Sequence, residues 1–413
     1  MKKKFFKNPK TNAFLTVFLI LIIFFILEIF TRITLGFFGY PTTYKLGNIG
    51  VNNYDYLTGY YNKPNKESFF KTSTSKIKGR IGFNQGTDRY GFHIDGKRKS
   101  DKDLSKKKNC IYRIFLVGGS TVIGKDLKDF NDPLSARIEK ILDDSFKDFN
   151  IFFEVINTGA TSFFSGQELL LLQNRILFNL KSNHIIVLNG TNDYLVPLGE
   201  NQFYSNSHYY QRQFQRNFLK SQNNVINLFD SFLSRNVSIY FLFKKIIEKS
   251  TSVTFFDQDK RDFYENSNLD LIEVKKKRYF YNLKMIGNLS RSDLPINIFF
   301  QPQMLPDNKD NLVEIDKSFF NLFDKKNGEY FKGKQHFYNI VRNEIKNMKE
   351  QNNLGYHIDD ISNILDDNKN EVNFYSDHVH YTNHSRKIIS KNIFENIKVN
   401  VKTNILNNFK NCF

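Results

Sequence analysis

Four short, continuous runs of apolar residues constrain the fold of this 413-residue chain more than any other feature of its sequence. The runs are IYRIFLV at 111–117, FFEVI at 152–156, HIIVL at 184–188 and INIFF at 296–300. Continuous apolar strands, in contrast to alternating ones, are typical of a parallel sheet that is covered on both faces. The sequence therefore predicts an open α/β sheet with right-handed crossover connections.

The segments between these runs have helical patterns. DPLSARIEKILDDSF at 132–146 places its apolar residues on one stripe, with Asp132 as a candidate helix cap. GQELLLLQNRILFNL at 166–180 is apolar around much of its surface. Residues 200–290 and 310–365 are mostly polar and helical in character, and we interpret them as insertions on the sheet.

The N-terminus combines a basic tail with a long apolar run. Five lysines in residues 1–12 precede AFLTVFLILIIFFILEIF at 13–30, where Glu28 is the only charge and can pair with Arg32. The run approaches the roughly 20 residues that cross a bilayer, and the lysines predict a cytoplasmic N-terminus. We expect an uncleaved single-pass anchor at 13–36, with the rest of the chain on the extracytoplasmic (periplasmic) side of the cytoplasmic membrane. A cleaved signal peptide is the alternative, but the run is long and lacks a small-x-small cleavage site.

The remaining chain is predicted to consist of an extension followed by one large domain. Residues 37–109 indicate a stalk with irregular strands, including TDRYGFHID at 87–95, and residues 110–413 form the domain. Cys110 and Cys412 flank that domain. They could form a disulfide in an oxidising compartment or remain two free thiols, and the sequence does not decide between these alternatives.

The charge of the chain does not indicate a nucleic-acid partner. Its formal net charge is +18, and clustered cations would release counterions from phosphates. However, the lysines are spread along the chain, and no compact basic run is interleaved with aromatic residues. We predict no nucleic-acid partner.

Three of the apolar runs end in clusters of small and polar residues. The clusters are GGST at 118–121, NTGA at 157–160 and NGTND at 189–193. Each cluster by itself is typical of an ordinary turn. Because ligands of open α/β sheets bind beyond the carboxyl ends of the strands, three such clusters are expected to converge on one site.

A fourth cluster lies near the C-terminus. Asp377 and His380 are three residues apart, so one turn of backbone can fold the carboxylate onto the imidazole, as a general-base histidine requires. His378 and His384 raise a metal alternative, because 380 and 384 are one helical turn apart. No cysteine accompanies them, and no glutamate stands where H-E-x-x-H needs one.

The turn at 118–126 can also be interpreted as a nucleotide-binding loop. Gly119 to Lys125 fits the phosphate-binding pattern G-x-x-x-x-G-K-[ST], but Asp126 stands where a magnesium ligand of Ser or Thr is required, and its charge would repel phosphates. The G-x-S-x-G elbow fails as well, because Val122 occupies the second glycine position. Ser120 is still a serine at a strand-to-helix turn, where backbone N–H groups favour negative charge.

Taken in order, the four clusters resemble the SGNH hydrolase superfamily, also called GDSL-like lipases and esterases. GGST resembles the first block, NTG at 157–159 the second, GTND at 190–193 the third and DHVH at 377–380 the fifth. FFQP at 299–302 is similar to the strand before the final helices of membrane-anchored members. Two departures are the Gly-Gly-Ser form of the first block and Ser385, where many members have glycine.

The resemblance implies a three-layer α/β/α, flavodoxin-like fold and a Ser-His-Asp mechanism without metal or organic cofactor. In that mechanism Ser120 is the nucleophile, His380 is the base and Asp377 orients the base. The oxyanion hole is formed by the backbone N–H groups of Ser120 and Gly159 and by the side-chain amide of Asn192.

The expected function is therefore that of a membrane-anchored serine esterase or acyl-transferring enzyme. Its expected substrates are O-acyl esters, O-acetyl esters among them, of envelope carbohydrate or lipid. Hydrolysis and transfer share an acyl-enzyme, so the sequence does not separate them. The alternative is a non-catalytic carbohydrate-binding or scaffolding protein that retains the fold.

Overall fold

The structure is a computed structural model that describes residues 9–37, 52–55, 59–62, 64–65, 86–95, 103–106, 110–124, 127, 131–195, 233, 236–240, 242–243, 246, 269–307, 312–327, 330–350, 356–366, 372–377 and 379–412. The chain divides into two units. One contains residues 1–49 and 212–259, and the other contains residues 50–211 and 260–413.

The larger unit is built on a five-stranded parallel sheet with the order β4-β3-β5-β6-β7. Its strands are β3 (Ile111–Gly118), β4 (Phe152–Asn157), β5 (His184–Asn189), β6 (Ile296–Phe300) and β7 (His357–Asp360). The first four coincide with the predicted apolar runs, and β5 and β6 are buried along their whole length. β7 lies inside the segment that we interpreted as an insertion. It forms the edge of the sheet, and its sequence, HIDD, contains one apolar residue and therefore no apolar run.

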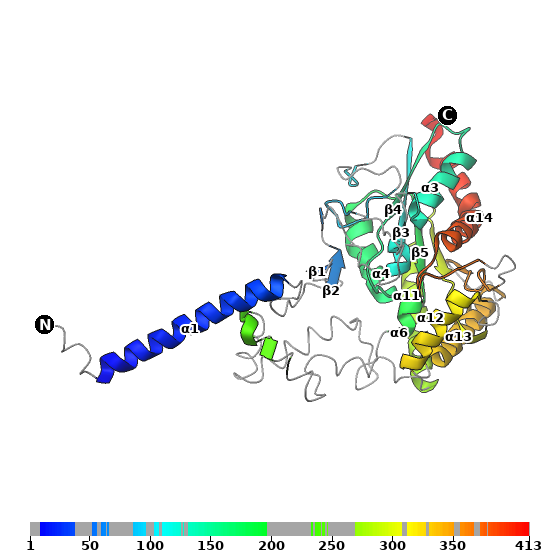
Figure 1. The fold of residues 1–413 in the computed structure, drawn as a ribbon. Coiled ribbons are helices and arrows are strands. Elements are labelled where there is room, and N and C mark those ends of the chain that lie inside the picture. Colours follow the sequence, from blue (N-terminus) through cyan, green and yellow to red (C-terminus); the bar gives the residue numbers. More distant parts are fainter. Residues whose placement is uncertain are drawn as a thin grey trace. The chain divides into compact units, whose positions relative to one another are not determined.

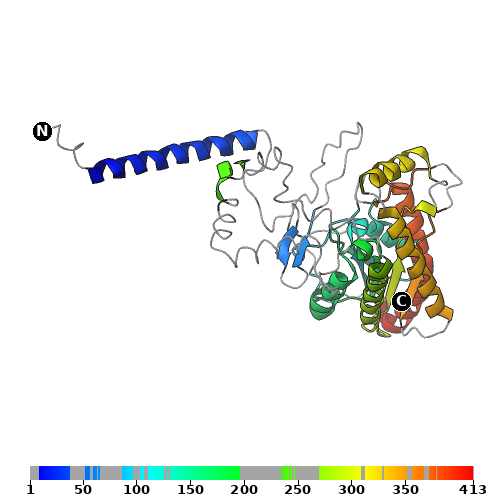
Figure 2. The same ribbon diagram turned by 90° about the horizontal axis from the view of Figure 1, so that it is seen from below.

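Helices cover both faces of this sheet (Figures 1 and 2). α3 (Leu134–Ser145) and α14 (Asn383–Asn408) pack against each other on one face. On the other face, α11 (Leu269–Gly287) packs against α4 (Ser165–Leu171) and α13 (Tyr330–Glu350). The predicted three-layer α/β/α architecture is confirmed.

Local details differ from the sequence prediction in two helices. The N-cap of α3 is Pro133, with no side-chain cap. The predicted cap was wrong because the Asp132 carboxylate instead accepts a hydrogen bond from Arg137, at 2.9 Å. The predicted helix at 166–180 is divided into α4, a π-helical turn at Leu172–Ile176 and α5 (Leu177–Asn179).

Shorter elements complete the larger unit. α2 (Ser120–Ile123) follows β3, α6 (Thr191–Leu195) follows β5, and α12 (Glu314–Asn327) precedes α13. β1 (Asn52–Asp55) and β2 (Gly59–Asn62) form a separate antiparallel pair. These two strands belong to the same unit as the sheet.

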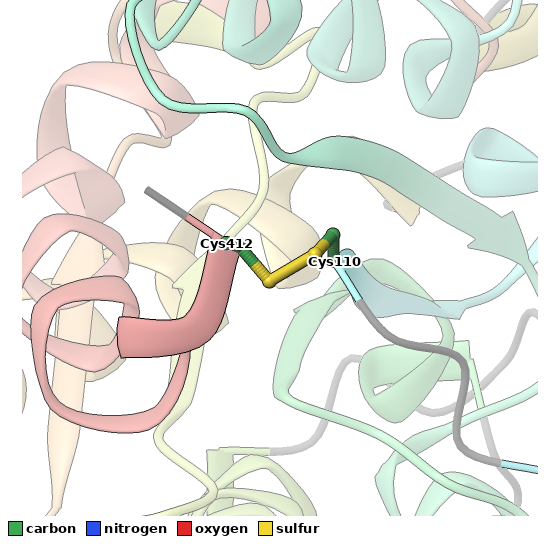
Figure 3. Close-up of a disulfide and its surroundings, with 2 residues drawn as sticks. All are labelled: Cys110 and Cys412. Carbon is green, nitrogen blue, oxygen red and sulfur yellow. A yellow bond between two sulfur atoms is a disulfide. The ribbon is translucent and has the colours of Figure 1, made fainter.

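A disulfide joins Cys110 to Cys412 (Figure 3). Cys110 immediately precedes β3, and Cys412 lies in the 3₁₀ turn Lys410–Cys412 after α14. Their Cα atoms are 5.5 Å apart although 302 residues separate them in sequence. Of the two alternatives open from the sequence, the structure has the bridge, which ties the two ends of the domain.

The smaller unit contains α1 (Pro9–Phe37). Within it Leu15–Leu35 has a mean hydropathy of 2.5, so α1 is long and apolar enough to cross a membrane, a property that signal sequences share. Glu28 pairs with Arg32 as predicted, with Nε and Oε1 2.7 Å apart. The Glu28 carboxylate also accepts hydrogen bonds from the backbone N–H groups of Ser238 and Ile239.

Candidate active site

The candidate site lies at the carboxyl edge of the sheet, where β3 and β5 end side by side. Ser120 is the first residue of α2 directly after β3, and Asn192 lies in α6 directly after β5. The connection from β3 runs to β4 on one side and the connection from β5 runs to β6 on the other, which makes the gap between β3 and β5 a topological switch point. Ligands of open parallel sheets bind at such points.

Ser120, His380 and Asp377 form a continuous hydrogen-bonded chain. His380 Nε2 lies 2.9 Å from Ser120 Oγ, and His380 Nδ1 lies 2.9 Å from each carboxylate oxygen of Asp377. The side chains of His380 and Asp377 are only 18% and 21% exposed. The structure therefore brings the three residues of the predicted triad together, from segments about 260 residues apart in sequence.

The backbone of the Asp377–His380 loop orients its own carboxylate. Asp377 Oδ1 accepts hydrogen bonds from the N–H groups of Val379 (2.9 Å) and His380 (2.8 Å). An antiparallel bridge between Tyr375 and Tyr381 closes the base of the loop. The loop ends before Thr382, the N-cap of α14, whose side chain accepts from Ser385 N. The Asp-x-x-His spacing thus corresponds to a closed turn at the start of a helix, as predicted.

Asn192 and the N–H of Ser120 are available at the nucleophile turn. Asn192 Nδ2 donates to the carbonyl of Phe163 at 2.7 Å, which leaves its second N–H free of that bond. A Cβ atom at Gly119 would lie 2.4 Å from the same Nδ2, so only glycine permits this approach. Ser120 begins α2, where backbone N–H groups have no acceptor within the helix.

Gly159 lies against the nucleophile turn but has its own hydrogen bonds. A Cβ atom there would lie 2.7 Å from the nitrogen of Ile123 and 3.1 Å from the carbonyl oxygen of Gly119. Its N–H donates to Asn157 Oδ1 at 3.1 Å. The structure thus brings Gly159 against Gly119 and Ile123 of the nucleophile turn, while its N–H has an acceptor within its own turn.

The sequence reasoning missed the residues that hold Gly159. The Gly159 carbonyl accepts from Asn62 Nδ2 at 2.8 Å and lies 3.0 Å from His93 Nε2. The Tyr61 hydroxyl donates to the carbonyl of Thr158 at 3.2 Å. All three come from the region that we interpreted as a stalk with irregular strands, and all are buried. The only sequence feature that could have indicated their role was the histidine in the short alternating stretch GFHID.

Buried carboxylates support the turn that carries Asn192. Asp193 accepts a hydrogen bond from Ser165 N at 3.1 Å, and Glu168 accepts one from Asn189 Nδ2 at 2.6 Å. Burial raises the pKa of Glu168, and the nearby charge of Asp193 raises it further. Burial raises the pKa of Asp193 to about 6, against the opposing effect of the Arg278 charge. Arg278 of α11 also donates to the Asp193 carbonyl, so α11 is part of the support.

The two alternative chemistries are not supported by the described residues. His384 stacks on the ring of Phe374, with ring centroids 5.8 Å apart. No group of three metal-ligating side chains occurs within the described ranges. His378, Lys125 and Asp126, on which the metal and nucleotide alternatives partly depended, lie outside those ranges.

Comparisons with known proteins give distant structural matches. No family model matches the chain, and no curated protein matches it. An acetyl xylan esterase variant from Geobacillus stearothermophilus matches at 9% identity, over 69% of this chain and 94% of that one, with a TM-score of 0.37. A member of the lipolytic G-D-S-L family from Veillonella parvula matches at 13% identity, over 69% and 97% of the chains, with a TM-score of 0.31.

The architecture itself can be stated from the sheet and the motifs. The order β4-β3-β5-β6-β7 is the flavodoxin-like order, and the four ordered motifs follow β3, β4 and β5 and precede α14. The chain therefore has a three-layer α/β/α, flavodoxin-like architecture, with the four motifs placed around the carboxyl edge of its sheet.

Proposed function

We propose that this protein is a serine esterase or acyl-transferring enzyme that uses Ser120, His380 and Asp377. The observation that carries the proposal is the hydrogen-bonded chain from Ser120 Oγ through His380 to Asp377. Nucleophilic catalysis by serine requires a base within hydrogen-bond reach and a third group that orients the base. The distances from Ser120 Oγ to His380 Nε2 and from His380 Nδ1 to Asp377 Oδ2 are both 2.9 Å.

The proposed reaction begins with attack of Ser120 Oγ on an ester carbonyl carbon while His380 Nε2 accepts the serine proton. The tetrahedral intermediate collapses, the bond to the alcohol oxygen breaks, and His380 returns the proton to that oxygen. Water or an acceptor hydroxyl then attacks the acyl-serine by the reverse sequence. Asp377 fixes the Nδ1–H tautomer and stabilises the imidazolium.

Three donors are proposed for the oxyanion. The Ser120 N–H and the second N–H of Asn192 lie at the nucleophile turn without a competing bond among the described residues. The Gly159 N–H is the third, and it has to be shared with Asn157 Oδ1. Preorganised donors of this kind are usually the largest single contribution to acyl transfer.

We further propose that the enzyme is held by α1 as a single-pass protein of the cytoplasmic membrane and works on the periplasmic side. The apolar stretch Leu15–Leu35 and the basic residues before it support the anchor and its direction. The Cys110–Cys412 disulfide supports an oxidising compartment. O-acyl esters of envelope carbohydrate or lipid, O-acetyl esters among them, are the substrates in reach of such a site.

The test uses the full-length protein in detergent micelles, treated with a fluorophosphonate and examined by intact mass. We expect one adduct per chain on the wild type and none on Ser120→Ala. Turnover of p-nitrophenyl acetate is then compared with that of longer acyl esters. If a folded wild type forms no adduct and hydrolyses no ester, the non-catalytic binding protein replaces the esterase.

A further inference from the structure

The segment Gln301–Pro302–Gln303 follows β6 at the same edge of the sheet as the candidate site. Its two glutamine side chains are 3% and 0% exposed. Buried amides require hydrogen-bond partners, because an unsatisfied donor or acceptor retains the full cost of leaving water. The partners of this segment lie in the nucleophile turn, the Asn192 turn and the Asp377–His380 loop.

Gln301 connects the nucleophile turn to the Asn192 turn. Its Oε1 accepts a hydrogen bond from Thr121 Oγ1 at 3.1 Å, and its Nε2 donates to Thr191 Oγ1 at 2.8 Å. Thr121 directly follows Ser120, and Thr191 directly precedes Asn192. One amide group therefore fixes the separation between the nucleophile and the side chain proposed to bind the oxyanion.

Pro302 and Gln303 hold the loop that carries the base. Gln303 Nε2 donates to the carbonyl of Val379 at 3.4 Å. The hydroxyl of Tyr381 donates to the carbonyl of Pro302 at 2.7 Å. Val379 and Tyr381 are the two chain neighbours of His380, so the segment holds the backbone on both sides of the imidazole.

Lys334 of α13 fixes the direction of the Gln303 amide. Its Nζ donates to Gln303 Oε1 at 2.7 Å, and the lysine is 0% exposed. Because an ammonium only donates, Oε1 has to face Lys334, and Nε2 then faces Val379. Burial lowers the pKa of Lys334 to about 7, while the charge of Asp377 acts in the opposite direction and favours the ammonium.

We propose that Gln301 and Gln303, with Lys334 as the buried donor that orients Gln303, are positioning residues that hold Ser120, Asn192 and His380 in one geometry. This proposal rests on the proposed esterase function. None of the three side chains is required to contact the substrate. Their effect is therefore on the alignment of the reacting groups, where displacement by about 1 Å can cost about 10²-fold in rate.

The first experiment is hydrogen exchange measured by mass spectrometry on the full-length protein in detergent. Gln303→Met and Lys334→Met should speed exchange in residues 375–382 by about tenfold or more, because that loop loses its anchor. Gln301→Met should instead speed exchange in residues 119–124 and 189–193. Gln335→Met is the matched control, because Gln335 is a neighbour on α13 whose amide, among the described residues, bonds to Asp307 and Asn339 and not to the Asp377–His380 loop.

The second experiment is kinetic. In each of the three variants we expect kcat for p-nitrophenyl acetate to fall by about 10- to 100-fold, with KM within about threefold, because alignment and not binding is lost. The double variant Gln303→Met with Lys334→Met should be no worse than the poorer single variant, since the two residues act as a unit. Gln303→Glu keeps the acceptor for Lys334 and removes the donor to Val379, so it should match Gln303→Met even if Lys334→Met folds poorly.

The outcomes separate the two proposals. Unchanged exchange of the 375–382 loop in both Gln303 variants overturns the positioning role, whether or not the protein is an esterase. Additive losses in the double variant, or equal effects of Gln335→Met, overturn it as well. A wild type that reacts with no fluorophosphonate overturns the esterase function instead, and the exchange data still decide whether the segment holds the loop.

Discussion

The two edges of the parallel sheet use polar residues in opposite ways. At the carboxyl edge, Ser120, Asn192 and His380 are partly exposed, and His380 Nε2 lies 2.9 Å from Ser120 Oγ. At the amino edge, Arg113 is paired with Glu154 at 3.0 Å, and both are almost fully buried. The three partly exposed side chains at the carboxyl edge are thus available for chemistry, while Arg113 and Glu154 at the amino edge neutralise each other.

The amino edge also closes the domain covalently. The Cys110–Cys412 disulfide lies there, beside the start of β3. A cavity of about 390 Å³ at the same edge is lined by residues that include Arg113, Lys181 and Arg291. This cavity is larger than a water site, but it contains none of the proposed catalytic residues. The direction of the strands, and not the presence of a cavity, therefore predicts where the active site lies.

The largest expected effect at the carboxyl edge comes from His380→Ala. Without its base, Ser120 is an ordinary alcohol, so kcat should fall by about 10⁴-fold or more, while the melting temperature stays close to that of the wild type. The measurement is turnover of a short acyl ester beside a thermal melt. His384→Ala is the matched control, because His384 stacks on Phe374 outside the hydrogen-bonded chain, and it should keep its turnover. Equal losses in the two variants would contradict the assigned role of His380.

Asn192→Ala is expected to have the next largest effect. Loss of one oxyanion donor typically lowers kcat by about 10²- to 10³-fold. The amino edge offers a matched asparagine, because Asn183 accepts a hydrogen bond from the backbone N–H of Arg113 through Oδ1, at 2.9 Å. Asn183→Ala should lower the melting temperature and leave kcat unchanged. If both variants lost activity to the same extent, the functional division between the two edges would be wrong.

The sequence predicts the parts of the molecule that depend on local pattern. Continuous apolar runs locate β3 to β6, and the turns that follow β3 and β5 contain Ser120 and Asn192. The Asp377–His380 pair is also local, because its hydrogen bonds close within one loop. Their convergence could be expected because parallel strands end at a common edge.

The remaining parts of the site depend on contacts between distant segments. Asn62 and His93 reach Gly159 from residues that precede the sheet, and Lys334 reaches Gln303 from a helix that we interpreted as part of an insertion. A lone asparagine, histidine or lysine has no periodicity that distinguishes it from a surface residue. β7 was missed because its four residues contain one apolar side chain, Ile358, which is too few to form an apolar run.

Removal of the disulfide should destabilise the larger unit without changing its chemistry. The bridge closes a loop of 302 residues, so Cys110→Ser with Cys412→Ser should lower the free energy of unfolding by about 5 kcal/mol, near the upper end of the effects seen for disulfides. At a temperature where the variant stays folded, kcat should match that of the wild type. The check is urea unfolding followed by tyrosine fluorescence, since the chain contains no tryptophan. A loss of kcat in the folded variant would show that the two edges are coupled.

His184, the first residue of β5 at the amino edge, should make stability depend on pH. Burial lowers its pKa to about 4, against the opposing hydrogen bond to Asn297, and the charge of His357 lowers it further. The folded state therefore favours the neutral imidazole. The contribution is fully present above the unfolded pKa of about 6.5 and is lost as pH falls toward about 4, by about 3 kcal/mol.

His184→Gln keeps a hydrogen-bonding side chain that does not titrate, so it isolates this contribution from the carboxylates that titrate in the same range. The difference in the free energy of unfolding between wild type and variant, followed from pH 7 to pH 4, should move by about 3 kcal/mol in favour of the variant. Turnover at pH 7 should not differ, because His184 lies at the opposite end of β5 from Asn192. A constant difference across this range would mean that His184 binds its proton equally well in the folded and unfolded chain, so that burial of the imidazole does not control its protonation.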